Sequence, residues 1–335
     1  TYHHCRSTAE WDGSWWHPRG PANVGSGVPL ERTGAAMAFN HYYNRLWLFG
    51  GESSYSSCEG SGDSFCRYMW GWDGGSWERW LPSGDWPTSR HNAAMVSNGW
   101  TYVYLYGGRN SESGCDEGVA NSEYCDELWR WSTSAWTRVS TSGWGPGGRE
   151  NHAMAYDSSR NELLVVGGYY DTSHATSTHR LDLNDNTWTW VDLCLFPPCS
   201  FTEPPPLSNG GLVYDASRDR YVYFGGSGPG YPSGSNETWE FDPDSGTWRQ
   251  VCTASPCADN VPGPRWSHAM WYDAATRRVV VANGANQEDT WAWDGSVWRQ
   301  LEPLELTDDG QPERSGDFVT AYDSRQERAY VYGGN

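Results

Sequence analysis

Short apolar segments recur along this chain, and each one ends in a glycine pair or its equivalent. Runs of four or five apolar residues bounded by turn residues are typical of buried strands. The six pairs are Gly50-Gly51, Gly107-Gly108, Gly167-Gly168, Gly225-Gly226, Asn283-Gly284 and Gly333-Gly334. Successive pairs are 50 to 60 residues apart. A repeat of this length with several strands predicts a radial or solenoid β array.

The fifth repeat indicates what each repeat contains. Residues 265–273 and 279–282 form two apolar strand-like runs, and 290–293 form a third. Asp294-Gly295 then leads into a fourth run that carries Trp298. Asp-Gly between two strands predicts a hairpin with a type I′ turn. Four antiparallel strands per repeat describe a propeller blade, and the absence of capped 3.6-residue periodicity excludes a helical solenoid.

The two ends of the chain complement each other. The last repeat stops after two strands, and residues 9–15 match the third and fourth strands at 291–298. The N-terminal strands should therefore pair with the C-terminal strands, which removes open sheet edges. We predict one all-β domain, residues 1–335, folded as a six-bladed β-propeller. The expected blades are 32–77, 90–136, 149–188, 209–248 and 265–298, with a sixth closed by 1–17 and 314–335.

The repeat resembles the kelch family along essentially the whole chain. The resemblance rests on the glycine pairs and on motifs such as Arg149-Glu150-Asn151-His152-Ala153-Met154 and Arg265-Trp266-Ser267-His268-Ala269-Met270. These look most like secreted bacterial kelch-repeat proteins. We call the arginine that opens each motif the lead arginine; the fourth repeat has Leu207 there instead. The resemblance implies a kelch propeller, a fold that hosts binding proteins and a few unrelated enzymes.

Cysteine spacing predicts disulfides. Eight of the nine cysteines form four close pairs, Cys58 with Cys66, Cys115 with Cys125, Cys194 with Cys199, and Cys252 with Cys257. Pairs inside single loops favour local disulfides and a secreted or extracellular location, with the cell surface or periplasm as variants. Zinc is the alternative, and the spacing fits it poorly. Cys5 is left over as a free thiol or an intermolecular link. No signal peptide is visible, so a secreted protein would be represented here by its mature form or by a trimmed piece of it.

The net charge and the hydropathy of the chain limit the classes of partner that it could bind. The net charge is −19, and all 23 basic residues are arginine. An acidic surface argues against nucleic acids and anionic membranes, which require a basic face. The chain also has no apolar stretch long enough to span a membrane as a helix.

Strand polarity divides the loops between two faces. Loops after second strands share a face with the connections between blades, and all four cysteine pairs fall there. Loops after first and third strands are short hairpins on the plain opposite face. We expect the cysteine-rich face to be functional, because binding residues concentrate on loops held by a rigid scaffold. The alternative is that the disulfides only stabilise long loops.

Several side chains on this face are candidate ligand-binding groups. Trp86, Trp144 and Trp266 are expected near the rim of the channel, together with Arg149, Arg265, Glu150 and Asp317. Aromatic platforms beside charged groups suit sugar rings; alternatively, the tryptophans fill space between loops. The lead arginines Arg32, Arg90, Arg149, Arg265 and Arg314 either bind a carboxylate at the channel mouth or, as family resemblance implies, bond to carbonyls of neighbouring blades.

Catalytic and metal signals are sparse, and no catalytic residue is assigned. The chain lacks a nucleophile elbow, a phosphate-binding glycine loop and a His-Glu-x-x-His motif. Resemblance to sialic-acid mutarotases leaves an enzyme reading in which Arg149, Glu150 and Asp317 act on an acidic sugar. No cofactor is expected. His3 after Thr1-Tyr2 offers Cu(II) or Ni(II) a square-planar site, and acidic loops offer calcium a weak one without a complete loop motif.

These observations favour an extracellular binding or scaffold module. It would recognise a protein or a glycan through the loop-rich, disulfide-bonded face. One alternative is a subunit of an extracellular assembly, joined through Cys5 or the flat faces of the disc. The mutarotase-like enzyme is the other.

Overall fold

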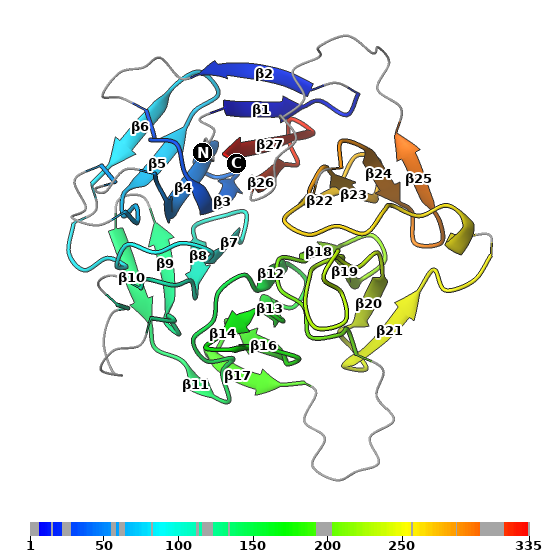
Figure 1. The fold of residues 1–335 in the computed structure, drawn as a ribbon. Helices are drawn as coiled ribbons and strands as arrows, with labels where there is room; N and C mark the ends of the chain where they lie inside the picture. The colour runs from blue at the N-terminus through cyan, green and yellow to red at the C-terminus, as the bar shows by residue number, and fades with distance from the viewer. Residues whose placement is uncertain are drawn as a thin grey trace. The chain divides into compact units, whose positions relative to one another are not determined.

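Each repeat forms an antiparallel sheet in which consecutive strands pair (Figure 1). The structure, a computed structural model, describes residues 7–14, 16–21, 28–54, 58–59, 64–81, 83–111, 114–115, 123–132, 135–191, 203–255, 257–285, 287–301 and 318–333. Six repeat sheets are present within these ranges, and they are the blades of a six-bladed β-propeller. The predicted all-β fold class is confirmed. The chain divides into two compact units, which are described separately.

Unit 1 comprises Thr1–Val139, Gly148–Glu150 and Glu302–Asn335 and carries three blades. Blade 1 contains β3 (Thr33–Asn40), β4 (Arg45–Glu52), β5 (Met69–Trp72) and β6 (Trp77–Trp80). Blade 2 contains β7 (Ala94–Ser97), β8 (Val103–Tyr106), β9 (Leu128–Ser132) and β10 (Ala135–Val139). Blade 6 contains β26 (Phe318–Asp323), β27 (Arg328–Gly333), β1 (Ser7–Trp11) and β2 (Trp16–Pro21).

Unit 2 comprises Ser140–Gly147 and Asn151–Leu301 and carries the other three blades. Blade 3 contains β12 (Ala153–Asp157), β13 (Glu162–Val166), β16 (Thr178–Asp182) and β17 (Thr187–Trp190), with β11 (Ser142–Gly143) added in parallel to β17. Blade 4 contains β18 (Gly211–Asp215), β19 (Arg220–Phe224), β20 (Thr238–Asp242) and β21 (Thr247–Val251). Blade 5 contains β22 (Ala269–Asp273), β23 (Arg278–Ala282), β24 (Thr290–Trp293) and β25 (Trp298–Leu301).

Short additional elements lie between the blade strands of unit 2. A small hairpin joins β14 (Tyr169–Tyr170) and β15 (Ser173–His174). The 3₁₀ helix η1 (Cys257–Asp259) is the single helix of the described chain. Nothing in that part of the chain is therefore a helix of the length and apolarity needed to cross a bilayer.

The two ends of the chain meet in blade 6, where β1 pairs with β27 on one side and β2 on the other. The buried carboxylate of Glu10 on β1 accepts hydrogen bonds from Arg328 on β27 and from Arg19 on β2. The predicted closure of the last blade by the N-terminal strands is confirmed. Trp11 pairs with Trp16, so Trp16 rather than Trp15 stands at the position that Trp298 occupies in blade 5.

In blades 1 to 5 the glycine pair, or Asn283-Gly284, ends the second strand with two residues of positive φ. Gly50 and Gly51 have φ of 73° and 95°, a conformation that glycine adopts without a steric penalty. A Cβ on Gly50 would lie 2.4 Å from the carbonyl oxygen of Arg90. Gly51 N–H donates to that same carbonyl at 2.9 Å. The glycine pair of blade 1 therefore sets the close approach of the segment that opens blade 2.

The turns between third and fourth strands differ from the prediction. Trp293 pairs with Trp298, which leaves four residues in the turn rather than two. Only Gly295, with φ of 97°, is left-handed. The Asp294 carboxylate accepts N–H groups of the two residues after the glycine, at 2.9 and 3.0 Å. The expected type I′ turn is therefore wrong, and an aspartate-capped turn replaces it.

Apolar side chains of neighbouring blades interlock inside each unit. One cluster joins Tyr330 and Tyr332 of blade 6 to Leu46 and Leu48 of blade 1. A second packs Trp47 of blade 1 against blade 2. Two further clusters join blade 3 to blade 4 and blade 4 to blade 5 in unit 2. Burial of large aromatic rings between sheets supplies much of the stabilisation of such a fold.

Candidate functional site

The blade strands create two distinct edges in each unit. We call the edge with the glycine pairs and the lead arginines the glycine-pair edge. The opposite edge carries the turns between first and second strands, and we call it the hairpin edge. The loops with Cys58–Cys66 and Cys115–Cys125 follow second strands, and Cys252–Cys257 follows a fourth strand, so all three lie at the glycine-pair edge.

The four lead arginines that the structure describes, Arg32, Arg90, Arg149 and Arg265, are buried, and Arg314 lies outside the described residues. Arg90 donates to the carbonyl oxygen of Gly107 at 3.2 Å and to the Glu127 carboxylate at 3.1 Å. Arg265 makes the same pair of contacts in blade 5, to the carbonyl of Asn283 at 3.1 Å and to Asp289 at 2.8 Å. Each guanidinium thus joins the end of a second strand to the residue before a third strand. Charge-assisted hydrogen bonds of this kind compensate the burial of the charge.

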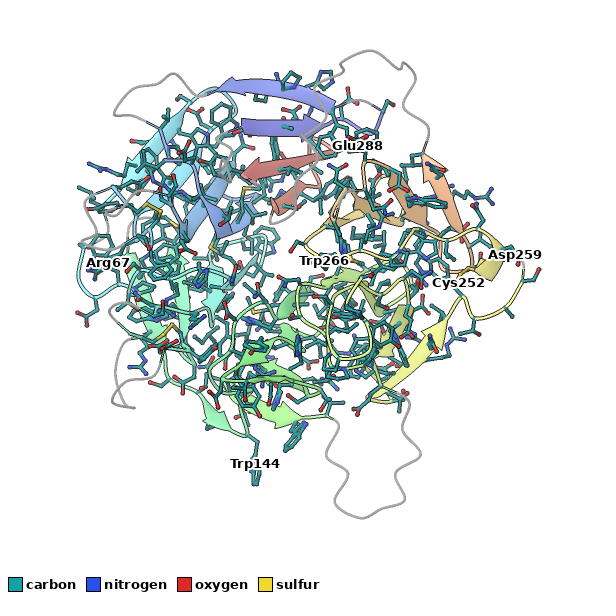
Figure 2. All side chains as sticks on the ribbon, in the orientation of Figure 1. Arg67, Trp144, Cys252, Asp259, Trp266 and Glu288 are labelled. Atoms are coloured by element: carbon teal, nitrogen blue, oxygen red, sulfur yellow. A yellow bond between two sulfur atoms is a disulfide. The ribbon has the colours of Figure 1, made fainter. Side chains whose placement is uncertain are left out.

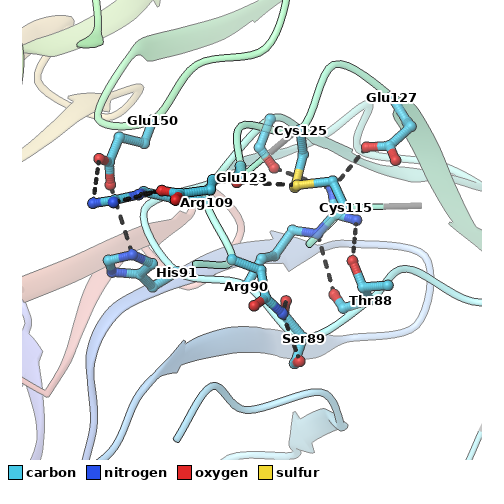
Figure 3. The surroundings of a disulfide bond; sticks show 12 residues. Thr88, Ser89, Arg90, His91, Arg109, Cys115, Glu123, Cys125, Glu127 and Glu150 are labelled. Atoms are coloured by element: carbon cyan, nitrogen blue, oxygen red, sulfur yellow. Dashed lines mark hydrogen bonds and ion pairs between the residues drawn. A yellow bond between two sulfur atoms is a disulfide. The ribbon is translucent and has the colours of Figure 1, made fainter. Parts of the chain in front are cut away.

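A network of charged side chains lies beside this arginine in unit 1 (Figure 3). His91 Nε2 is 3.7 Å from Glu150 Oε2, and Arg109 Nη1 is 3.8 Å from Glu150 Oε1. Glu123 binds Arg109 at 2.6 Å, and Glu52 lies 3.7 Å from His91. We call Glu52, His91, Arg109, Glu123 and Glu150 the unit 1 cluster.

Position in the repeat explains why these side chains meet. His91 directly follows a lead arginine, and Arg109 directly follows a glycine pair. Their backbones exchange two hydrogen bonds, His91 N–H to Arg109 O at 3.1 Å and Arg109 N–H to His91 O at 2.9 Å. Asn92 Nδ2 donates to Glu150 at 2.8 Å and fixes its carboxylate.

Two disulfides hold aromatic rings against the unit 1 cluster. Cys66 and Cys125 occupy equivalent positions before the third strands, since their N–H groups donate to the carbonyl oxygens of Gly51 at 2.8 Å and Gly108 at 2.9 Å. Cys66 is bonded to Cys58, and Cys125 to Cys115. The residue before each of these cysteines is aromatic. Phe65 stacks on His91 with ring centroids 4.9 Å apart, and the Arg109 guanidinium lies 5.3 Å from the Tyr124 ring.

Burial sets the protonation of the unit 1 cluster. The pKa of His91 falls to about 4, because burial disfavours the imidazolium and the Arg109 charge opposes it further. His91 is therefore neutral at neutral pH, and its contact with Glu150 is not an ion pair there. Burial raises the pKa of Glu150, while the Asn92 hydrogen bond and Arg109 act in the opposite direction. Even with Glu150 protonated, Glu52 and Glu123 outnumber the Arg109 guanidinium.

The comparison with known families agrees with this repeat geometry. Residues 13–193 match the family described as the KLHDC2/KLHL20/DRC7 Kelch-repeats domain. The chain belongs to this kelch-repeat family.

Similar proteins carry kelch domains too. Kelch domain-containing protein 10 of Rattus norvegicus is 26% identical over 212 residues, 61% of this chain and 48% of the relative. Kelch domain-containing protein 3 of Rattus norvegicus is 28% identical over 226 residues, 64% of this chain and 53% of the relative. The aligned region thus spans about half the length of these relatives. Kelch propellers are typically protein-binding scaffolds.

The charged residues that were predicted as ligand-binding groups lie in different environments. Glu150 belongs to the unit 1 cluster, whereas Arg265 is fully buried in blade 5. Arg149 is also buried, and its backbone binds Cys125 O and Gly108 N–H at 3.3 and 2.9 Å. Asp317, Cys5 and His3 lie outside the described residues, as does the Cys194–Cys199 pair. The third described disulfide joins Cys252 to Cys257 in unit 2.

The three candidate tryptophans do not share one environment. Trp86 is half-buried, with the Arg67 guanidinium 4.5 Å from its ring and Tyr68 5.8 Å away. One ring face is therefore covered. Trp266 is half-buried beside Gly234 at the start of blade 5.

Trp144 projects into solvent beside the last strand of blade 3 (Figure 2), and 71% of it is exposed. Its N–H donates to Trp188 O of β17 at 3.3 Å, directly after the β11 pairing. The first strand of the blade, β12, is at the other side of the sheet. The prediction that Trp144 lies at the rim of the channel is therefore wrong.

Four members of the unit 1 cluster were absent from the sequence-based candidates, namely Glu52, His91, Arg109 and Glu123. A signal for three of them exists in the repeat itself. Glu52 and Arg109 each follow a glycine pair, and His91 follows a lead arginine. Aligning the repeats and asking which variable positions are charged would have found them. No group of three or more His, Cys, Asp or Glu side chains suited to a metal ion occurs within the described ranges.

Proposed function

We propose that this kelch propeller is an extracellular module that binds a protein partner through the unit 1 cluster. The observation that supports this proposal best is the cluster itself. Its charged side chains stand at positions that vary between the repeats, and two disulfides fix the loops around them on a rigid backbone. Binding residues concentrate on loops that a scaffold positions in this way. The same disulfides support an oxidising, extracellular setting.

The charges of the cluster favour a basic contact segment on the partner. Side chains of Glu52 and Glu123 are each 45% exposed, so they remain accessible to an incoming group. The protein as a whole carries a net charge of −19. Long-range attraction would therefore steer a basic surface towards the cluster, and this attraction weakens with salt.

Partner capture from the natural source tests the proposal. Immobilised wild-type protein is compared with the Glu52→Gln/Glu123→Gln variant, which keeps side-chain shape and removes two charges. The control is Glu78→Gln/Asp244→Asn, since those carboxylates are 58% and 75% exposed and lie elsewhere. The control removes the same net charge, so it separates the local site from the general field.

We expect wild type and control to retain the same protein at low salt, and the cluster variant to lose it. Equal capture by all three proteins would reject the unit 1 cluster as the binding site. Equal loss in both variants would assign binding to net charge alone. A second copy of this chain as the captured protein would convert the proposal into self-assembly through the same residues.

A chemical measurement tests the compartment independently. Thiol labelling of denatured protein from the natural source should find Cys58, Cys66, Cys115 and Cys125 fully oxidised. Labelled thiols at these positions would place the protein in a reducing compartment and remove that part of the proposal.

A further inference from the structure

Two turns on the hairpin edge of unit 1 depart from the pattern of the other blades. In blades 3 to 6 the first strand ends in an aspartate whose carboxylate accepts the N–H two residues later. In blades 1 and 2 an asparagine takes this role. Asn40 Oδ1 accepts Tyr42 N–H at 3.0 Å, and Asn98 Oδ1 accepts Trp100 N–H at 3.1 Å. The side-chain cap is retained and its charge is removed, although the blade 2 turn is one residue shorter and has its left-handed residue at Gly99.

The residue that the asparagine caps is aromatic in both turns and exposed. Tyr42 is 65% exposed and Trp100 is 69% exposed. The equivalent positions in the other blades hold small or charged residues, Ser159, Ser217, Ala275 and Arg325. The cap forms with each of these residues at its second position, so it does not itself require an aromatic ring. Large exposed aromatic side chains are a recurrent feature of binding surfaces.

The two turns are neighbours within unit 1. Asn40 Nδ2 donates to Ser97 Oγ at 3.1 Å across the gap between them. His41 Cδ2 lies 3.6 Å from the position of a Cβ on Gly99. These contacts involve the residues next to Tyr42 and Trp100 in the chain. Both turns join a first strand to a second strand, so Tyr42 and Trp100 lie at the same edge of the unit.

The two turn segments carry no carboxylate of their own. Residues 97–102 contain no charged side chain, and residues 40–44 contain no carboxylate or arginine. Charged groups reach the turns from other strands, since Arg325 donates to His41 O at 3.0 Å and the Arg130 guanidinium lies 4.7 Å from the Tyr102 ring. Amides, hydroxyls and backbone groups flank the rings. Such groups bond sugar hydroxyls, while the apolar C–H face of a sugar stacks on an aromatic ring.

We propose that Tyr42 and Trp100 form a binding platform for an uncharged polysaccharide. The platform lies on the hairpin edge, so it is separate from the unit 1 cluster on the glycine-pair edge. A neutral glycan fits because it is neither repelled by the acidic protein nor dependent on an ion pair. Two rings on adjacent turns would contact successive stretches of one extended chain.

Binding assays with defined polysaccharides test this proposal. The full chain is incubated with insoluble cellulose and chitin, and run in affinity electrophoresis with soluble β-glucan, xylan and mannan. The variants are Trp100→Ala, Tyr42→Ala and the double variant. The matched control is Trp144→Ala, because Trp144 is equally exposed but belongs to unit 2. Circular dichroism and thermal melting verify that each variant is folded.

We expect wild type to bind at least one of these polysaccharides with little dependence on salt. Trp100→Ala should weaken binding by roughly tenfold, and the double variant should weaken it further. Trp144→Ala and Glu52→Gln/Glu123→Gln should bind like wild type, so this test and the partner-capture test can fail separately. Absence of binding to all five polysaccharides, or unchanged binding by the double variant, would overturn the platform. Loss of the captured protein partner in Trp100→Ala, without any polysaccharide binding, would reassign the surface to a protein.

Discussion

The glycine-pair edges of the two units share one backbone arrangement and differ in their side chains. In unit 1 His91 and Arg109 exchange two backbone hydrogen bonds. In unit 2 Ser208 and Ser227 occupy the same positions and exchange the same two bonds, each 2.9 Å long. Charged groups thus stand where unit 2 has hydroxyls. The comparison shows that the fold requires backbone pairing at these positions and leaves the choice of side chain free.

Among the described residues, disulfides in the loops after second strands follow the same division, whereas the unit 2 disulfide Cys252–Cys257 follows a fourth strand. Cys66 and Cys125 of unit 1 correspond to Ala175 and Ser235 of unit 2. The N–H groups of Ala175 and Ser235 donate to the equivalent glycine carbonyls, those of Gly168 and Gly226, at 2.9 and 2.8 Å. The hydrogen bond therefore forms without a cysteine. The cross-links add rigidity only to the loops that carry Phe65 and Tyr124 onto the charged cluster, which points to a functional demand in unit 1.

Blade 4 indicates that even the lead arginine is replaceable when the carboxylate that it would bind accepts hydrogen bonds from other donors. Leu207 stands in its place, and its carbonyl still accepts Gly168 N–H at 3.0 Å. Glu237, at the position of Glu127 in blade 2, accepts the Tyr231 hydroxyl at 2.8 Å and the Trp239 indole N–H at 2.9 Å. The requirement is a satisfied carboxylate rather than an arginine.

The largest loss of stability is expected when a buried carboxylate of unit 1 loses its hydrogen-bond donor. Arg90→Ala leaves the fully buried Glu127 carboxylate without its guanidinium and should lower the free energy of unfolding by about 3–5 kcal/mol. Urea denaturation measures the loss. Arg90→Leu/Glu127→Leu should recover part of it, because no buried charge remains unpaired.

A buried carboxylate with an exposed arginine partner provides the control, because Glu240 also binds Arg218 and keeps that partner. Arg249 contacts Glu240 at 3.2 Å, but its side chain is 73% exposed. Arg249→Ala should cost less than about 1 kcal/mol. A cost at Arg249 as large as at Arg90 would contradict the view that burial makes the lead arginine essential.

Removal of disulfides should separate stability from binding. Cys115→Ser/Cys125→Ser opens a loop with a sequence separation of 10 and should cost about 3 kcal/mol. Cys252→Ser/Cys257→Ser in unit 2, with a separation of 5, should cost about 2 kcal/mol. Urea midpoints measure both. Only the first variant should lose the partner protein, and loss of capture in both would remove the special role of unit 1.

Two buried histidines, one in each unit, allow the pH dependence of stability to be compared between the units. The pKa of His268 in unit 2 falls to about 3 through burial and the nearby Arg265 charge, and that of His91 in unit 1 falls to about 4. The unfolded chain binds these protons near pH 6.5. As pH falls below 6.5, the unfolded state is protonated first, so the free energy of unfolding falls.

Each histidine should contribute about 2 kcal/mol of this loss between pH 6.5 and pH 5. Urea titrations of wild type, His268→Gln and His91→Gln over this range measure the contributions as differences. The loss through His91 should stop near pH 4, whereas that through His268 should continue towards pH 3. Parallel pH curves for wild type and both variants would contradict buried neutral imidazoles.

The fold followed from the sequence because its signals are local and repeated. Glycine pairs mark the ends of second strands, and the predicted strand 279–282 lies within β23, Arg278–Ala282. The terminal closure followed because the Trp-Asp-Gly-Ser motif between the third and fourth strands of the fifth repeat, at 293–296, recurs at 11–14. Placement of Trp144 failed, because a two-residue parallel pairing such as β11 with β17 has no recognisable pattern.

The unit 1 cluster was only partly predictable for a different reason. Glu150 was selected from its motif, yet its partners come from three other segments of the chain. His91 meets Glu52 across a blade boundary, and Glu123 reaches Arg109 from a disulfide-bonded loop. Such contacts depend on tertiary geometry that repeat spacing does not encode. The exposed rings of Tyr42 and Trp100 were missed because the hairpins were treated as equivalent.

The smallest effect is expected from converting unit 1 into the unit 2 pattern. His91→Ser/Arg109→Ser replaces the charged pair by the serines found at 208 and 227. The two bonds between these residues are backbone bonds and should survive. The variant loses the Phe65 stack and the half-exposed ion pair with Glu123, so its free energy of unfolding should change by less than about 1 kcal/mol. Urea denaturation measures this change, and partner capture measures function in the same preparation. Capture should be lost while stability is retained. A destabilisation comparable to that of Arg90→Ala would mean that the charged side chains belong to the framework of unit 1, and the division between backbone requirement and variable chemistry would then fail.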